Sequence, residues 1–152
     1  MAESAWLTAT DSSDNESSGE TTRIAVERSV LVVACAVSAG IHGALVRDYL
    51  AEGAALGAGF LIATVLLIGL AGALTNRADR QLLLASAAVV AGLIVAYLFA
   101  ITTGLPFLHP EVETADGLAV FTKSVEALGL VVALDLLGRT GVNLHSHERT
   151  TT

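Results

Sequence analysis

The stretch Leu82–Thr103, LLLASAAVVAGLIVAYLFAITT, decides the fold. It carries no charged side chain, and its length matches the roughly 20 apolar residues that a helix needs to cross a hydrocarbon core about 30 Å thick. Because that core holds no water, the backbone of such a segment must satisfy its polar groups internally, as a helix does. The sequence therefore predicts a transmembrane helix over 82–103.

Three further apolar segments of similar length surround this one, at Ser29–Val46, Ala54–Leu74 and Leu118–Leu137. The connections between consecutive segments are short, which favours antiparallel neighbours. The whole chain is 53% hydrophobic with a mean hydropathy of +0.68, more apolar than soluble domains usually are. We predict an all-α fold, an up-down bundle of four transmembrane helices spanning 29–46, 54–74, 82–103 and 118–137.

The two ends of the chain are polar. Residues 1–22 are rich in Ser, Thr, Asp and Glu and contain few apolar side chains. Such a segment cannot bury enough apolar surface to offset the entropy lost on ordering, so we predict a disordered acidic tail. Residues 23–138 then form the transmembrane domain, and 139–152 form a polar C-terminal tail.

The distribution of basic residues predicts the orientation. Six arginines lie on the side of the bundle that carries both termini, namely Arg23, Arg28, Arg77, Arg80, Arg139 and Arg149. The opposite side has Arg47 and, inside the fourth segment, Lys123. Since short loops rich in Lys and Arg stay in the cytoplasm, we expect a cell-membrane protein with both termini cytoplasmic.

The charge of the chain limits its partners. The formal net charge is −7, and no basic stripe is present that could neutralise phosphates, so nucleic acid is not expected as a partner. The expected partners are the lipid bilayer and either a larger membrane complex or further copies of the chain. An acidic, lysine-poor composition is typical of halophilic archaea or of high-GC actinobacteria. The single cysteine, Cys35, excludes an internal disulfide and a Cys-based zinc site.

Glu126 is the least expected residue of the apolar half. It lies about 12 Å inside the fourth segment at 1.5 Å per residue, and a carboxylate at that depth costs roughly 2.5–3.5 kcal/mol. Either Lys123, three residues away on the same helix, or His42 on the first helix could compensate it.

Two interpretations of these polar residues stay open. In one, His42, Glu52, His109 and Glu126 form a metal or proton site, because imidazole and carboxylate suit transition metals such as Cu, Zn, Ni or Fe. In the other, Lys123 and Glu126 form a buried ion pair, and His42 makes a hydrogen bond between helices. At the opposite end of the fourth segment, Asp135 and Arg139 have the spacing of a structural ion pair.

Parts of the chain resemble an uncharacterised family of small four-helix membrane proteins of actinobacteria and haloarchaea. The resemblance rests on GIHGALVRDYLAEGAALGAGFLIATVLL, on YLFAITTGLPFLHPEVE and on the helix with KSVEAL. It matches His42, Glu52, Gly104–Pro106 and Glu126 over roughly 29–137. Some members have a second His in the first outer loop, where this chain has Asp48 and Tyr49. The resemblance implies the architecture and the location of the site, and it brings no assigned reaction.

The sequence contains no phosphate-binding glycine loop and no arrangement of nucleophile, base and acid, so a non-catalytic role is favoured. The first hypothesis is an accessory subunit of a larger membrane complex. The alternative is a metal- or proton-binding membrane protein that uses the His and carboxylate residues. A third hypothesis is an oligomeric pore or transporter.

Overall fold

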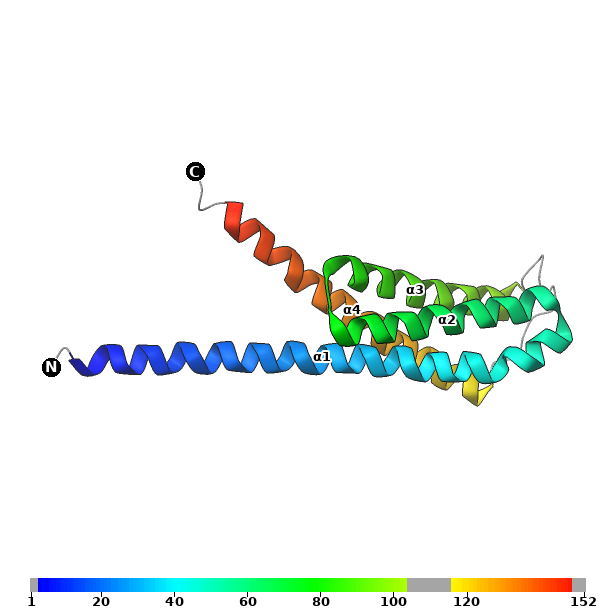
Figure 1. Cartoon of the computed structure of the whole chain (residues 1–152), viewed down its shortest axis with the longest axis horizontal. Helices are drawn as coiled ribbons and strands as arrows, with labels where there is room; N and C mark the ends of the chain where they lie inside the picture. Colours follow the sequence, from blue (N-terminus) through cyan, green and yellow to red (C-terminus); the bar gives the residue numbers. More distant parts are fainter. Residues whose placement is uncertain (1–2, 104–115, 149–152) are drawn as a thin grey trace.

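The protein is helical in the computed structural model, which describes residues 3–103 and 116–148 and their side chains within 18–103 and 116–140. Helix α1 (Glu3–Glu52) is followed by α2 (Ala54–Asn76), α3 (Arg80–Thr102) and α4 (Gly117–Glu148). Figure 1 shows α1 as a long rod, with α2 and α3 running beside one half of it and α4 crossing it obliquely. Both ends of the chain lie on the same side of the bundle, as four antiparallel passes require.

Each helix contains a segment long and apolar enough to cross a membrane, within Ser18–Glu52, Ala54–Asn76, Arg80–Thr102 and Gly117–Thr140. Their outward faces carry large apolar side chains that are more than half exposed, including Ile62, Val65, Phe121 and Val131. Hydrocarbon can cover such faces, whereas water would oppose their exposure. The prediction of an all-α bundle of four transmembrane helices is confirmed: this is a small multi-pass membrane protein.

The outer parts of α1 and α4 depart from the sequence-based expectation. Helix α1 begins at Glu3 and α4 continues as far as Glu148, so both extend beyond the predicted spans, and the disordered character of residues 1–22 stays a prediction. A helix that has already formed extends by one internal hydrogen bond per residue, so it needs no packing partner to grow. Residues 18–26 are exposed, and Arg23 supports this part of α1 through Glu27 on the same helix at 2.8 Å and through Asp135 on α4 at 3.9 Å.

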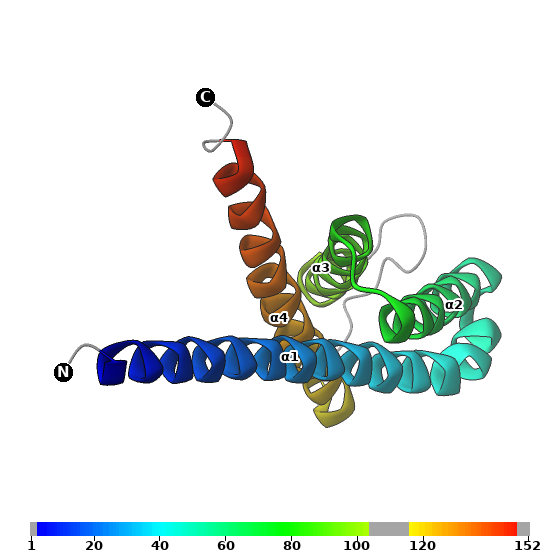
Figure 2. The same cartoon turned by 60° about the vertical axis from the view of Figure 1, so that its left-hand side comes forward.

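The four helices form a ring in the order α2, α1, α4, α3. Helix α1 packs most extensively on α2 and also on α4, while α4 packs on α3 (Figure 2). The apolar core comprises Leu31, Cys35, Ala39, Leu67, Leu74, Leu83, Ala87, Val90, Ala133 and Leu136. Most of these residues lie in the half of the bundle nearer the two termini, which leaves the other half for the polar residues.

Two glycines allow close contacts between helices. A Cβ added to Gly129 would lie 3.1 Å from the Cβ of Ala34, so α4 and α1 approach closely at this point. A Cβ on Gly43 would lie 3.2 Å from Cγ2 of Thr64, where α1 meets α2. Small residues are a general means by which helix backbones approach each other in lipid, because no larger side chain holds them apart.

The first two connections are shorter than the sequence suggested. Gly53 alone separates α1 from α2, and the turn requires Gly57, because a Cβ there would run into Leu50. Asp79 caps α3 by accepting a hydrogen bond of 2.9 Å from the backbone N–H of Leu82. Asp116 caps α4 in the same way, with Ala119 as the donor at 2.6 Å. Both caps satisfy backbone donors that a helix start leaves unpaired.

A charged network holds α1 to α4 at the end near the termini. The predicted Asp135–Arg139 pair is confirmed, with 2.7 Å between Arg139 Nη2 and Asp135 Oδ2. Arg139 also lies 3.3 Å from Glu27 Oε1 on α1, and Arg23 reaches both acids. The exposure of Arg23 and Asp135 means that solvent and salt weaken these pairs, so we regard the network as a structural clamp.

Candidate functional site

Glu126 lies at the centre of a buried polar cluster formed by Ser38, His42, Lys123 and Glu126. The residue is 1% exposed, and both of its carboxylate oxygens have partners. Lys123 Nζ donates to Oε2 at 2.6 Å, and the Ser38 hydroxyl of α1 donates to Oε1 at 2.7 Å. The carboxylate is thus compensated by a charge on its own helix and by a hydrogen bond from another.

His42 completes the cluster from α1. It is 7% exposed, and its Nε2 lies 3.9 Å from Glu126 Oε1. Its Nδ1 lies 2.9 Å from the backbone oxygen of Ser38, one turn earlier on the same helix. A carbonyl oxygen can only accept, so this contact assigns a proton to Nδ1. In the neutral ring the lone pair of Nε2 then faces the carboxylate.

Lys123 connects the cluster to α3. Its Nζ lies 3.4 Å from the backbone oxygen of Leu93 and 5.4 Å from the centre of the Tyr97 ring. The ammonium is therefore held by a carboxylate, a carbonyl dipole and an aromatic face. The Tyr97 hydroxyl is buried and has no hydrogen-bond partner among the described residues.

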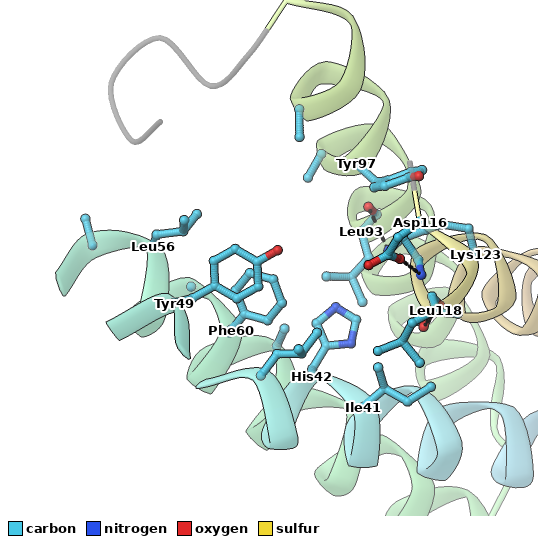
Figure 3. A pocket seen from close by; sticks show the side chains of 18 residues that line it. Ile41, His42, Tyr49, Leu56, Phe60, Leu93, Tyr97, Asp116, Leu118 and Lys123 are labelled. Atoms are coloured by element: carbon cyan, nitrogen blue, oxygen red, sulfur yellow. Dashed lines mark hydrogen bonds between the residues drawn. The ribbon is translucent and has the colours of Figure 1, made fainter. Parts of the chain in front are cut away.

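A cavity of about 320 Å³ opens beside the cluster, in the half of the bundle away from the termini. His42 and Lys123 contribute to its wall, together with Tyr49, Phe60 and Tyr97 (Figure 3). The rings of Tyr49 and Phe60 are stacked with their centres 4.0 Å apart, and Phe60 is 5.4 Å from the His42 ring. The cluster thus borders this half-open pocket, with Glu126 buried behind Lys123 and His42.

The structure brings together two of the four residues predicted for a metal or proton site. His42 and Glu126 are neighbours, whereas Glu52 is exposed at the end of α1 and takes no part in the cluster. His109 lies outside the described residues. Within the described part of the chain, no group of three or more His, Cys, Asp and Glu side chains could hold a metal ion.

One of the two contacts of the alternative interpretation is present as predicted, and the other differs in its partner. Lys123 and Glu126 form the expected ion pair, and His42 hydrogen-bonds, although its partner is the backbone of its own helix rather than another helix. Sequence reasoning did not identify Ser38 or Tyr97. Ser38 was detectable, because it lies four residues before His42 and so shares its helix face. The unpaired Tyr97 hydroxyl is a property of packing and has no sequence signal.

No protein-family model, no curated protein and no solved structure matches this chain.

The burial of the Lys123–Glu126 pair generates a prediction about stability. Lys123→Met leaves a buried carboxylate without its cation, and we expect it to lower the free energy of unfolding by about 3–5 kcal/mol. The double variant Lys123→Met/Glu126→Met removes both charges and should recover most of that loss. Thermal unfolding in detergent measures all three proteins. A double variant that is no more stable than the single one would contradict a paired, buried carboxylate.

Proposed function

We propose that this membrane protein works through a proton-binding site at His42, with Glu126 as its counter-ion. The single observation that carries the proposal is the orientation of His42: its Nδ1 proton is directed to the Ser38 carbonyl, and its Nε2 lies 3.9 Å from Glu126 Oε1. A proton arriving at Nε2 therefore adds a positive charge next to a carboxylate. Ionisable groups inside a membrane are costly, so those that occur there usually serve a function.

The same contacts disfavour a metal. Both Glu126 oxygens already accept short hydrogen bonds, and the nearest donor is the ammonium of Lys123. A cation bound by His42 and Glu126 would have to displace Ser38 or lie close to that positive charge. A proton needs neither change, since the ring nitrogen and the carboxylate already face each other.

The exchange of a proton would alter the cluster in a defined way. With His42 neutral, Lys123 and Glu126 balance each other and the cluster carries no net charge. With His42 protonated, Glu126 is shared between two cations, so its bond to Lys123 weakens. Because Lys123 also contacts Leu93 on α3, the protonation state of His42 on α1 can influence how α3 packs against α4.

Proton uptake at His42 can be measured directly. We expect wild-type protein in weakly buffered detergent to take up about one proton more on acidification than His42→Gln does, because the other histidines are common to both. Glu126→Gln should reduce the uptake, since the added charge loses its counter-ion. Asp135→Asn is the matched control: it removes a carboxylate from the same helix outside the cluster and should leave the uptake unchanged.

Metal analysis of the same samples separates the two chemistries. If the wild type holds stoichiometric metal and His42→Gln does not, the site is a metal site and the proton proposal is wrong. Equal proton uptake by wild type and His42→Gln would remove the proposal.

We further propose that the protein acts as an accessory subunit of a larger membrane complex. This role is supported by α1, whose N-terminal end continues past the other helices (Figure 1), and by the exposed apolar side chains Ile24 and Val26 on the same helix. Native electrophoresis of mildly solubilised membranes should show the 15.6 kDa chain in a band far above its own mass. A band at the mass of the chain alone would count against this role.

The proposed orientation places both termini in the cytoplasm of the cell and the cavity at the outer side, in accord with the arginine distribution. In a Cys35→Ala background, a cysteine at the exposed Glu52 position should react with an impermeant thiol reagent added to intact cells. A cysteine at the exposed Arg77 position should react only after lysis. The opposite pattern would reverse the orientation.

A further inference from the structure

The cavity beside the buried cluster is built by the chain itself. Its wall contains small residues from α2, α3 and α4, namely Ala55, Gly59, Ala63, Ala96, Ala100 and Ala119. Larger side chains at these positions would close the space. The pocket is half open rather than enclosed, and residues of all four helices line its roughly 320 Å³, a volume in the range of sites that bind small molecules.

We propose that this cavity binds a small, neutral, flat-ringed molecule that carries a carbonyl oxygen. The shape follows from the aromatic wall. Figure 3 shows Tyr49, Phe60 and His42 following one another on one side, with Tyr97 and Lys123 across the space from them. Stacked side chains offer flat faces on which another ring can lie, and the remaining wall is mainly aliphatic.

We infer the carbonyl oxygen of the ligand from the hydrogen-bond donors in the cavity wall. The Tyr97 hydroxyl is buried without a partner among the described residues, and an unsatisfied buried hydroxyl is unfavourable. Lys123 has three N–H groups, of which the contacts with Glu126 and Leu93 use two. Both side chains line the cavity, so a carbonyl oxygen of the occupant can accept a hydrogen bond from either.

From the charged groups around the cavity, we infer that the ligand carries no net charge. Glu126 already compensates the Lys123 ammonium at 2.6 Å, and Asp116 adds a negative charge to the lining. An anionic ligand would be repelled by the Asp116 carboxylate, and a cationic one by the Lys123 ammonium, since both side chains line the pocket. A neutral molecule of this kind also dissolves in lipid, from which a protein within the bilayer can take it up.

This proposal adds a second ligand to the proton proposed above. His42 and Lys123 belong both to the proton site and to the wall of the cavity, but ligand binding does not depend on proton binding. The variants that test it lie on α2 and α3, and they leave the four cluster residues unchanged. Proton uptake at His42 can therefore be measured in the same variants, and either property can fail without the other.

The probe is 2-acetylnaphthalene, and its binding to the full chain in detergent is measured by calorimetric titration. We expect saturable binding to the wild type and an affinity at least about tenfold lower in Gly59→Leu and in Ala96→Leu, because the added side chains fill the cavity. Gly69→Leu is the matched control. Gly59 and Gly69 are both exposed glycines of α2 with nothing within 4 Å of an added Cβ, but Gly69 does not line the pocket, so this variant should bind like wild type.

Two further ligands and one variant test the chemistry. The isosteric 2-isopropenylnaphthalene lacks the acceptor oxygen, and Tyr97→Phe lacks one donor, so each should weaken binding roughly fivefold, as expected for one hydrogen bond. The anion 2-naphthoate should bind more weakly than the ketone. Equal binding of ketone and alkene would overturn the carbonyl assignment, and tighter binding of the anion would overturn the neutral one. Undiminished binding by Gly59→Leu would place the ligand outside the cavity and end the proposal.

Discussion

The structure depends on one constraint, which is the need to compensate the Glu126 carboxylate inside an apolar bundle. Its two oxygens accept from Lys123 on the same helix and from Ser38 on α1, so the polar contact joins α4 to α1. The close approach at Gly129 and Ala34 brings the two helices near enough for that contact. A hydrogen bond in a medium without water is hard to replace, because its groups find no alternative partner. The position of α4 against α1 is therefore specified by polar as well as apolar contacts.

The two halves of the bundle do different things. The half near the termini has the leucine-rich core and an exposed charged clamp of Arg23, Glu27, Asp135 and Arg139, both of which serve to hold helices together. The other half has small residues, aromatic rings and the buried cluster beside the half-open pocket. Such a division leaves one end well packed and the other adaptable. It is the arrangement expected where a site must admit a proton or a ligand without loosening the whole fold.

The proposed proton and ligand sites have a physical connection through Lys123. Its ammonium contacts Glu126 inside the cluster and also lines the cavity. A proton on His42 would draw Glu126 away from that ammonium, and the freed N–H groups would then be available to an acceptor in the cavity. When two binding events depend on the same side chain, their binding free energies are coupled. The proton would then change the affinity for the ligand by the same factor as the ligand changes the affinity for the proton. In this proposal, protonation and ligand binding would act on the same contact between α1, α3 and α4.

The sequence by itself determined the fold class, because four apolar segments of bilayer length admit no other solution than helices. It also made the Lys123–Glu126 and Asp135–Arg139 pairs possible to predict, since residues three or four apart on a helix are neighbours wherever the helix lies, although it left His42 open as an alternative partner of Glu126. It could not show that Glu52 is separate from His42, or that Ser38 and Tyr97 belong to the site. These features depend on the rotation and crossing of each helix relative to the others. Hydropathy records only that a segment is apolar, so which of its faces meets α1, α3 or α4 was decided by the tertiary structure, through packing and the pairing of buried polar groups.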